Sequence, residues 1–133
     1  MAESESHRSM KAIVKKELER ERYEVVEEPP YPPGRVSWTS YRPDLLGYRS
    51  ENGKEEVVLV ECETRPSIKK LEAKNSASAW FQQRLQGQGS VRRILAVPRG
   101  SLGAVNMRAR GVWEVWVIGS SSSLERFPAL GRQ

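Results

Sequence analysis

The sequence predicts a single α/β domain in which helices flank a central mixed β-sheet, in the order α-β-β-β-α-β-α-β. Three observations support this class: apolar side chains at helical spacing over residues 6–22, an Asn-Gly pair at 52–53, and a run over 57–60 that is apolar on both faces. A length of 133 residues suits one domain. We expect residues 1–5 and 120–133 to be flexible.

The N-terminal third is expected to form one helix and one strand. The helix over residues 6–22 is predicted by four apolar side chains with Lys and Glu between them: Met10, Ile13, Val14 and Leu18. Residues 23–27 follow as a short strand. Prolines clustered between residues 29 and 33 exclude regular structure, so we expect an irregular loop as far as Ser40.

Two strands over residues 41–49 and 54–64 are predicted to form a hairpin. Asn-Gly favours a type I′ turn, because that turn needs positive φ at both central residues. The second strand contains the Val-Val-Leu-Val run, so it should lie in the middle of the sheet with helices on both sides.

The second half is expected to alternate helices and strands. The elements are a helix over 67–85, a strand over 91–97, a short helix over 102–110 and a strand over 112–118. Trp113 and Trp116 fall on opposite faces of the last strand, and we expect them to pack in the core or at a dimer contact.

Composition excludes several classes of protein. No apolar run is long enough to span a membrane, and the polar, acidic N-terminus is unlike a signal peptide, so a cytoplasmic protein is expected. One cysteine and one histidine cannot build a disulfide or a structural zinc site. Cys62 is expected to be a core residue. Abundant Glu and Arg with little Asn suggest a thermophilic source.

The charge is divided unevenly along the chain. Residues 1–63 carry fourteen acids and ten bases, whereas residues 64–133 carry three acids and twelve bases. This asymmetry fits a basic face for a polyanion, and it fits an ordinary solvated surface equally well.

Asp44 is the only aspartate among seventeen acidic residues. A two-residue hairpin loop places Asp44 directly opposite Glu61, and Glu63 shares their face because a strand alternates with a period of two. Opposed like charges are destabilising, so a divalent cation with oxygen ligands, Mg²⁺ or Mn²⁺, is the simplest compensation. The alternative is that Glu63 pairs with Arg42 while Asp44 only caps the loop after Pro43.

These segments resemble the PD-(D/E)XK nuclease superfamily. The resemblance rests on Arg42-Pro43-Asp44-Leu45-Leu46-Gly47 and, after the hairpin, on Val58-Leu59-Val60-Glu61-Cys62-Glu63-Thr64. The small size and the N-terminal helix are most similar to archaeal Holliday-junction resolvases. The resemblance implies a restriction-endonuclease-like fold and metal-dependent hydrolysis of phosphodiester bonds, with Asp44 and Glu61 holding the metal.

Glu63 occupies the position where the superfamily usually has Lys, which is thought to orient or activate the attacking water. Glu63 could accept the proton of that water or add a metal ligand. Alternatively a lysine from the following helix reaches in, or the site is degenerate and only binds. The superfamily also often uses a Gln on that helix, for which Gln82 fits, and a Glu from the first helix, for which Glu17 is nearest.

A nucleic-acid substrate requires positive charge around the carboxylates. The candidates for contact with DNA are Arg35, Arg42, Arg65, Lys69, Lys70, Lys74 and Arg84. Cutting both strands of a duplex or junction favours a two-fold homodimer. We therefore expect a Mg²⁺-dependent endodeoxyribonuclease, structure-specific for junction or branched DNA. A degenerate nuclease fold that binds nucleic acid or a partner, and an unrelated α/β interaction domain, are the alternatives.

Overall fold

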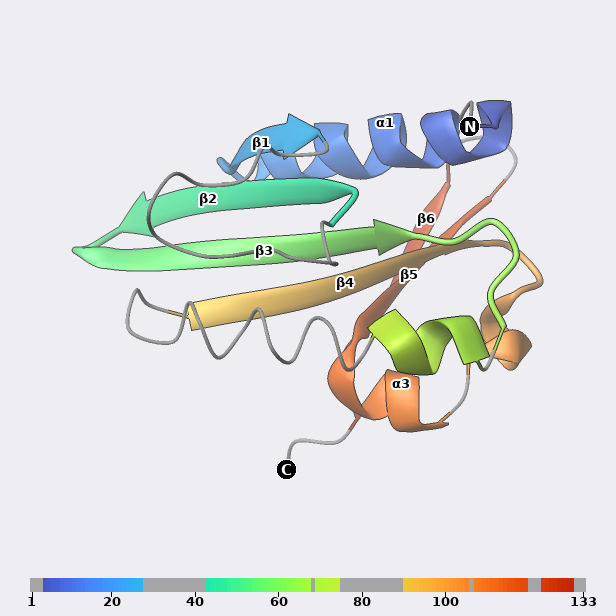
Figure 1. Ribbon diagram of the computed structural model, residues 1–133. Helices are drawn as coiled ribbons and strands as arrows, with labels where there is room; N and C mark the ends of the chain where they lie inside the picture. The colour runs from blue at the N-terminus through green and yellow to red at the C-terminus, as the bar shows by residue number, and fades with distance from the viewer. Residues whose placement is uncertain are drawn as a thin grey trace.

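The structure is a computed structural model that describes residues 4–27, 43–67, 69–74, 90–105, 107–119 and 123–130. Its strands form one mixed sheet in the order β1-β2-β3-β4-β5-β6 (Figure 1). β3, β4 and β5 run parallel, and the other neighbouring strands pair antiparallel. The elements are α1 (Glu5–Arg20), β1 (Glu24–Glu27), β2 (Leu45–Glu51), β3 (Lys54–Cys62), β4 (Ser90–Pro98), the 3-10 turn η2 (Leu102–Ala104), α3 (Met107–Val112), β5 (Glu114–Ile118) and β6 (Leu124–Phe127).

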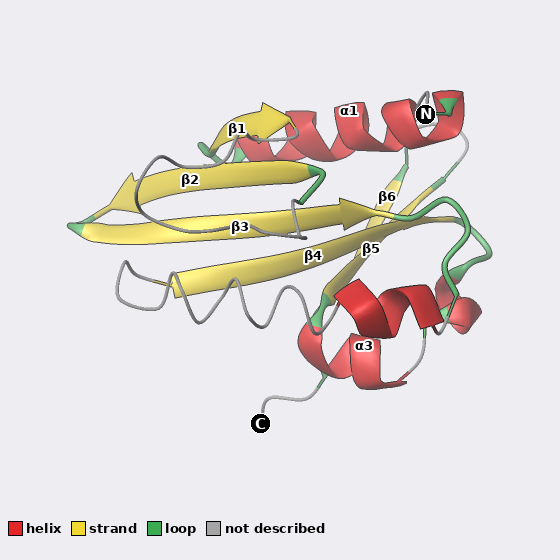
Figure 2. Cartoon of the chain, viewed as in Figure 1, coloured by secondary structure: helices red, strands yellow, loops and turns green. Residues whose placement is uncertain are grey.

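Helices cover both faces of the sheet (Figure 2). α1 lies against one face, where Val14 packs in the same core as Val58. A helical segment at 69–74 and α3 lie on the other face, where Leu71 packs in a second core with Trp113. The single α/β domain with a mixed sheet is therefore confirmed. None of the described helices is long and apolar enough to cross a membrane.

The C-terminal segment differs from the prediction. The predicted order of elements ends with the strand over 112–118, but β6 follows it and pairs antiparallel with β5. Leu124 and Phe127 pack against the cores on the two faces of the sheet. The guanidinium of Arg126 lies 4.2 Å from the centre of the Trp116 ring. Packing on both faces thus stabilises a short strand whose own sequence contains few apolar residues.

The C-terminal end of α1 closes in a Schellman motif. The backbone N–H of Arg22 donates to the carbonyl of Glu19 at 2.9 Å, and that of Tyr23 donates to Leu18 at 3.0 Å. Arg22 takes the left-handed conformation, with φ of 75°, that this motif requires. The reversal returns the chain to the sheet and buries Tyr23 directly before β1.

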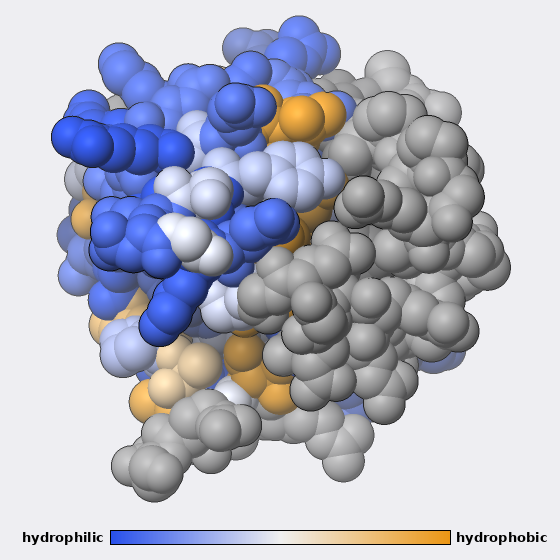
Figure 3. Space-filling view, turned by 90° about the vertical axis from the view of Figure 1, so that its left-hand side faces the viewer, coloured by the Kyte–Doolittle hydropathy of each residue, from blue (hydrophilic) through white to orange (hydrophobic). Residues whose placement is uncertain are grey.

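The β2–β3 hairpin forms in the predicted register. Asn52 and Gly53 have φ of 54° and 76°, as a type I′ turn requires. The pairing runs without interruption from Glu51 opposite Lys54 to Leu45 opposite Val60. Residues 51–55 at the turn are exposed, and most of the described surface at this end of the molecule is hydrophilic in Figure 3, with a few hydrophobic patches. Residues 57–60 are buried, which confirms β3 as a central strand.

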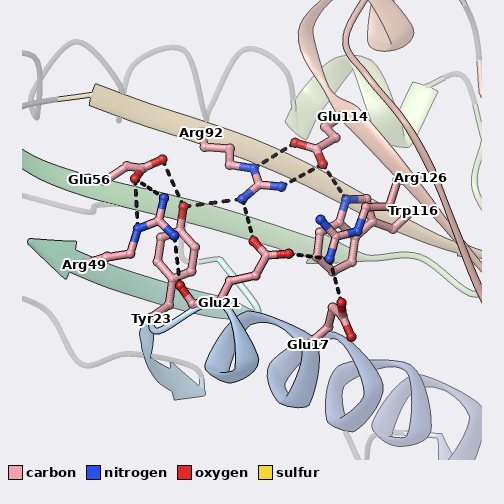
Figure 4. Close-up of polar contacts among 9 residues, drawn as sticks. All are labelled: Glu17, Glu21, Tyr23, Arg49, Glu56, Arg92, Glu114, Trp116 and Arg126. Atoms are coloured by element: carbon pink, nitrogen blue, oxygen red, sulfur yellow. Dashed lines mark hydrogen bonds and ion pairs between the residues drawn. The ribbon is translucent and has the colours of Figure 1, made fainter. Parts of the chain in front are cut away.

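A polar network fastens the C-terminal end of α1 to the sheet (Figure 4). Arg92 of β4 donates to both carboxylate oxygens of Glu114 at 2.8 Å. Its third nitrogen lies 3.3 Å from a carboxylate oxygen of Glu21 and 3.3 Å from the Tyr23 hydroxyl. Arg126 of β6 pairs with Glu21 as well. Three strands and the helix end are therefore joined by charge-assisted contacts at one end of the sheet.

Gly47→Ala is expected to destabilise the fold. A Cβ at this position would lie 2.5 Å from a methyl carbon of Val58 and 3.5 Å from Tyr23. We expect the free energy of unfolding to fall by about 1–3 kcal/mol because the packed core must shift. Urea denaturation measures this loss. Ser50→Ala, at an exposed position of the same strand, is the control; equal stabilities of the two variants would contradict the packing argument.

Acid is expected to unfold the protein partly through Glu114. Burial raises the pKa of the Glu114 carboxyl, but hydrogen bonds from Arg92 and Trp116 outweigh burial and hold the pKa below its ordinary value. The stability that Glu114 contributes is therefore present above the ordinary pKa and lost as the pH falls through the lowered value. Glu114→Gln should lose about 1–3 kcal/mol at pH 7 and lose less stability than wild type between pH ~5 and ~3.

Urea denaturation at a series of pH values measures both effects. Glu125→Gln is the matched control, because Glu125 lies exposed on neighbouring β6. A Glu114→Gln variant with the acid sensitivity of wild type would show that the carboxylate is not the group that titrates.

Candidate carboxylate site

Two buried carboxylates lie where the apolar part of β3 ends. Glu61 is 1% exposed and Glu63 is 7% exposed. Cys62, between them, belongs to the core under α1, so the alternation of the strand turns both glutamates toward the opposite face. The backbone N–H of Glu63 donates to Ala96 at 2.9 Å, which continues the pairing with β4 beyond the end of β3. The sheet therefore holds both carboxylates at a fixed spacing.

Lys74 lies between these two carboxylates. Its Nζ is 2.5 Å from Oε1 of Glu61 and 3.1 Å from Oε2 of Glu63. Burial lowers the pKa of Lys74, but the charges of Glu61 and Glu63 outweigh burial and raise it above its ordinary value. The amine is therefore an ammonium at neutral pH, and it neutralises much of the charge that β3 buries.

The helical segment at 69–74 brings Lys74 to the site. Leu71 anchors this segment in the core, and its backbone N–H donates to Ser67 at 2.9 Å. Lys70, one turn before Lys74, reaches Oε1 of Glu63 at 3.3 Å. The prediction that a lysine of the following helix could reach the carboxylates thus describes what Lys70 and Lys74 do in the structure.

Asp44 lies at the same end of the sheet but is held differently. The ladder of β2 and β3 ends at Leu45 opposite Val60, so Asp44 does not continue it opposite Glu61. Its backbone N–H donates to Val60 at 3.0 Å, and its Oδ2 accepts the backbone N–H of Cys62 at 2.8 Å. The carboxylate of Asp44 thus binds the backbone between the two glutamates.

The three carboxylates surround Cys62. Burial raises the pKa of the Cys62 thiol well above its ordinary value, and the charges of Asp44 and Glu61 raise it further. The thiol therefore stays protonated, which fits the predicted core role. Carboxylate oxygens are the donor type that Mg²⁺ and Mn²⁺ prefer, so the donor set fits such an ion in chemistry. Within the described ranges, however, no three acidic, His or Cys side chains already meet as a metal group.

The other predicted site residues are distributed as follows. Arg65, two residues after Glu63, and Lys69, next to Lys70, are exposed. Glu17 pairs with Arg126 at 2.8 Å, in the network near the C-terminal end of α1. It lies ten residues along α1 from His7, or about 15 Å at the rise of a helix, so it does not approach Asp44. Four more predicted residues fall outside the described ranges: Gln82, Arg35, Arg42 and Arg84.

Two residues of α1, His7 and Lys11, were not among the site residues predicted from the sequence. His7 Nε2 lies 3.5 Å from Oδ2 of Asp44. Lys11, one turn later, is 3% exposed, and its charge acts on the Cys62 thiol. Lys11 precedes Val14 by three residues and Leu18 by seven, so helical spacing places it on the buried face. That spacing was the available signal for Lys11, whereas no pattern in the sequence singles out His7.

Two solved structures share the fold of this chain. One is an XisH family protein from Nostoc punctiforme, with 16% sequence identity, a TM-score of 0.53, and coverage of 87% of this chain and 95% of that chain. The other is an fdxN element excision controlling factor protein from Anabaena variabilis, with 13% identity and the same TM-score and coverage. At these identities the likeness concerns the fold. No protein-family model and no curated protein sequence matches the chain.

Lys74→Met is expected to destabilise the protein strongly, because it leaves two buried carboxylates without their main counter-charge. We expect a loss of roughly 3–5 kcal/mol in the free energy of unfolding. Mg²⁺ or Mn²⁺ should recover part of the loss by supplying positive charge to the same oxygens. Thermal and urea unfolding with and without the ions measure both effects.

Lys69→Met is the matched control, because Lys69 is exposed on the same helical segment. If the two variants were equally stable, Lys74 would not be neutralising the buried pair. If divalent ions stabilised both variants to the same extent, the ions would not be acting at Glu61 and Glu63.

Proposed function

We propose that this chain is a Mg²⁺-dependent nuclease that hydrolyses phosphodiester bonds of DNA. The observation that carries the proposal is the grouping of Asp44, Glu61 and Glu63 around the end of β3, with the ammonium of Lys74 2.5 Å and 3.1 Å from the two glutamates. Two acids and a lysine at the end of an apolar strand are the elements of the PD-(D/E)XK pattern. Here the lysine comes from the following helix instead of the strand.

Each residue has a role that follows from its position. Asp44 and Glu61 would hold the ion, and Glu63 would accept a proton from the attacking water or add a ligand. A bound Mg²⁺ would polarise the phosphate and lower the pKa of bound water. Lys74 is held as an ammonium by its neighbours, so it would place a fixed positive charge beside the anionic phosphate.

DNA is the favoured polymer for two reasons. Arg65, two residues after Glu63, and Lys69, next to Lys70, are exposed, and we propose that they contact phosphates. One of the proteins with the same fold is named as an fdxN element excision controlling factor. More specifically, we propose that a two-fold homodimer acts on branched or junction DNA and cuts both strands.

One feature favours a second candidate, a nuclease fold that binds DNA without cutting it. The charge of Glu61 and Glu63 is already balanced by Lys74, and Oδ2 of Asp44 is already bonded to the backbone. A site whose carboxylates have such partners is stable without a metal. The two candidates differ in one measurable property, which is cleavage that requires a divalent ion.

The test is incubation of the protein with supercoiled, single-stranded, duplex and four-way-junction DNA, in Mg²⁺, in Mn²⁺ and in EDTA. We expect cleavage that EDTA abolishes and that Asp44→Asn and Glu61→Gln each reduce by about 10²-fold or more. Lys16→Ala, at an exposed position of α1, should cut as well as wild type. Circular dichroism confirms that each variant is folded.

The outcomes separate the candidates. Salt-sensitive DNA binding without cleavage in either metal would support the binding protein and contradict the nuclease. If Asp44→Asn cleaved DNA as well as wild type, the carboxylates would have no role in the mechanism. Absence of both binding and cleavage would leave an interaction domain that uses the fold for another purpose.

A further inference from the structure

We propose that His7 is a positioning residue for Asp44. In this assignment, His7 and the backbone N–H of Cys62 hold Oδ2 of Asp44, so that Oδ1 is the oxygen offered to a divalent cation. The inference rests on the proposed function, because it specifies how one carboxylate of that site is held. It also assigns a role to the single histidine of the chain.

The contacts of Asp44 converge on one of its two oxygens. The backbone N–H of Cys62 lies 2.8 Å from Oδ2, and Nε2 of His7 lies 3.5 Å from the same oxygen. The side chains of His7 and Asp44 are each 21% exposed, so water screens their contact only in part. The bond from Cys62 and the neighbouring imidazole both contact one oxygen, so together they restrict the rotation of the carboxylate and direct its second oxygen.

The backbone of α1 fixes the place of His7 even though it lies near the N-terminus. Oγ of Ser4 caps the helix by accepting the backbone N–H of His7 at 3.1 Å, and the Ser4 carbonyl accepts that of Arg8 at 3.0 Å. Met10 and Lys11, in the next turn, are both buried against the sheet. The imidazole therefore projects from a capped and anchored turn of the helix.

The position of His7 also complements that of Lys74. Three carboxylates lie around Cys62, while Lys74 approaches Glu61 and Glu63 from the helical segment on one face of the sheet. α1 lies on the opposite face and brings His7 to Asp44. In Figure 1 the N-terminal end of α1 and the carboxyl end of β3 lie at the same end of the molecule. Each face of the sheet thus supplies a nitrogen group to the carboxylates.

Side chains that orient a metal-binding carboxylate change metal affinity more than they change the chemistry at saturating metal. Loss of such a partner costs 10–100-fold in affinity or activity in metal sites generally. We therefore expect His7→Ala to raise the Mn²⁺ dissociation constant by about 10–100-fold. His7→Gln keeps an N–H donor and should recover most of the affinity.

The experiment measures Mn²⁺ binding to the purified full chain by electron paramagnetic resonance, without DNA. It is followed by cleavage as a function of Mg²⁺ concentration. His7→Ala should need about 10–100-fold more Mg²⁺ for half-maximal cleavage, with kcat at saturating Mg²⁺ nearly unchanged. Lys16→Ala, on the outward side of the same helix, should match wild type in every readout. Thermal unfolding of each variant reports on folding.

Each remaining outcome overturns an identified claim. Equal Mn²⁺ affinities of wild type and His7→Ala would overturn the positioning role, whether or not the protein cleaves DNA. A lower kcat at every Mg²⁺ concentration with unchanged affinity would also overturn it, since His7 would then act in the chemical step. Mn²⁺ binding that depends on His7 in a protein that cuts no DNA would support the inference and contradict the nuclease. A wild type that binds no Mn²⁺ would overturn both.

Discussion

Burial of β3 on both faces is the constraint on which the rest of the structure depends. On one face Val58 and Val60 belong to the core beneath α1, and on the other face Val57 and Leu59 are buried as well. Its carboxyl end continues directly into Glu61 and Glu63 before the backbone leaves the sheet. Charged groups at such a position need partners, because burial of an unpaired carboxylate costs several kcal/mol. Lys74 and the contacts around Asp44 are the partners that the fold provides.

α1 carries the second constraint, because it is attached to the sheet at both of its ends. At its C-terminal end the Schellman motif and the Arg92 network join it to β4, β5 and β6. At its N-terminal end the Ser4 cap sets His7 beside Asp44. The parallel strands run from the first attachment toward the second. Their amino ends therefore carry a structural network, and their carboxyl ends carry the groups suited to chemistry.

Local patterns made much of this arrangement predictable. The apolar spacing of α1, the Asn52-Gly53 turn and the run at 57–60 each depend on neighbours in sequence, and all three were predicted correctly. β6 was missed because its stability comes from packing against Trp116 and from ion pairs with α1. The register of the hairpin was predicted correctly as far as Leu45, but the position of Asp44 beyond it was not. The bond of Asp44 to Cys62 depends on how the chain enters β2, and its contact with His7 depends on where α1 lies. Local sequence patterns predict neither feature.

The alternation of β3 has a consequence for how the protein can change over time. Cys62 belongs to the apolar core, yet its backbone N–H binds Asp44, and its two neighbours in sequence are the buried glutamates. A larger or smaller side chain at this position would shift the same short stretch of backbone that spaces the carboxylates. Substitutions at Cys62 therefore change the spacing of the carboxylates. Substitutions around Arg92, several residues back along the neighbouring strand, leave that spacing unchanged. The two ends of the sheet are thus exposed to different selective pressures.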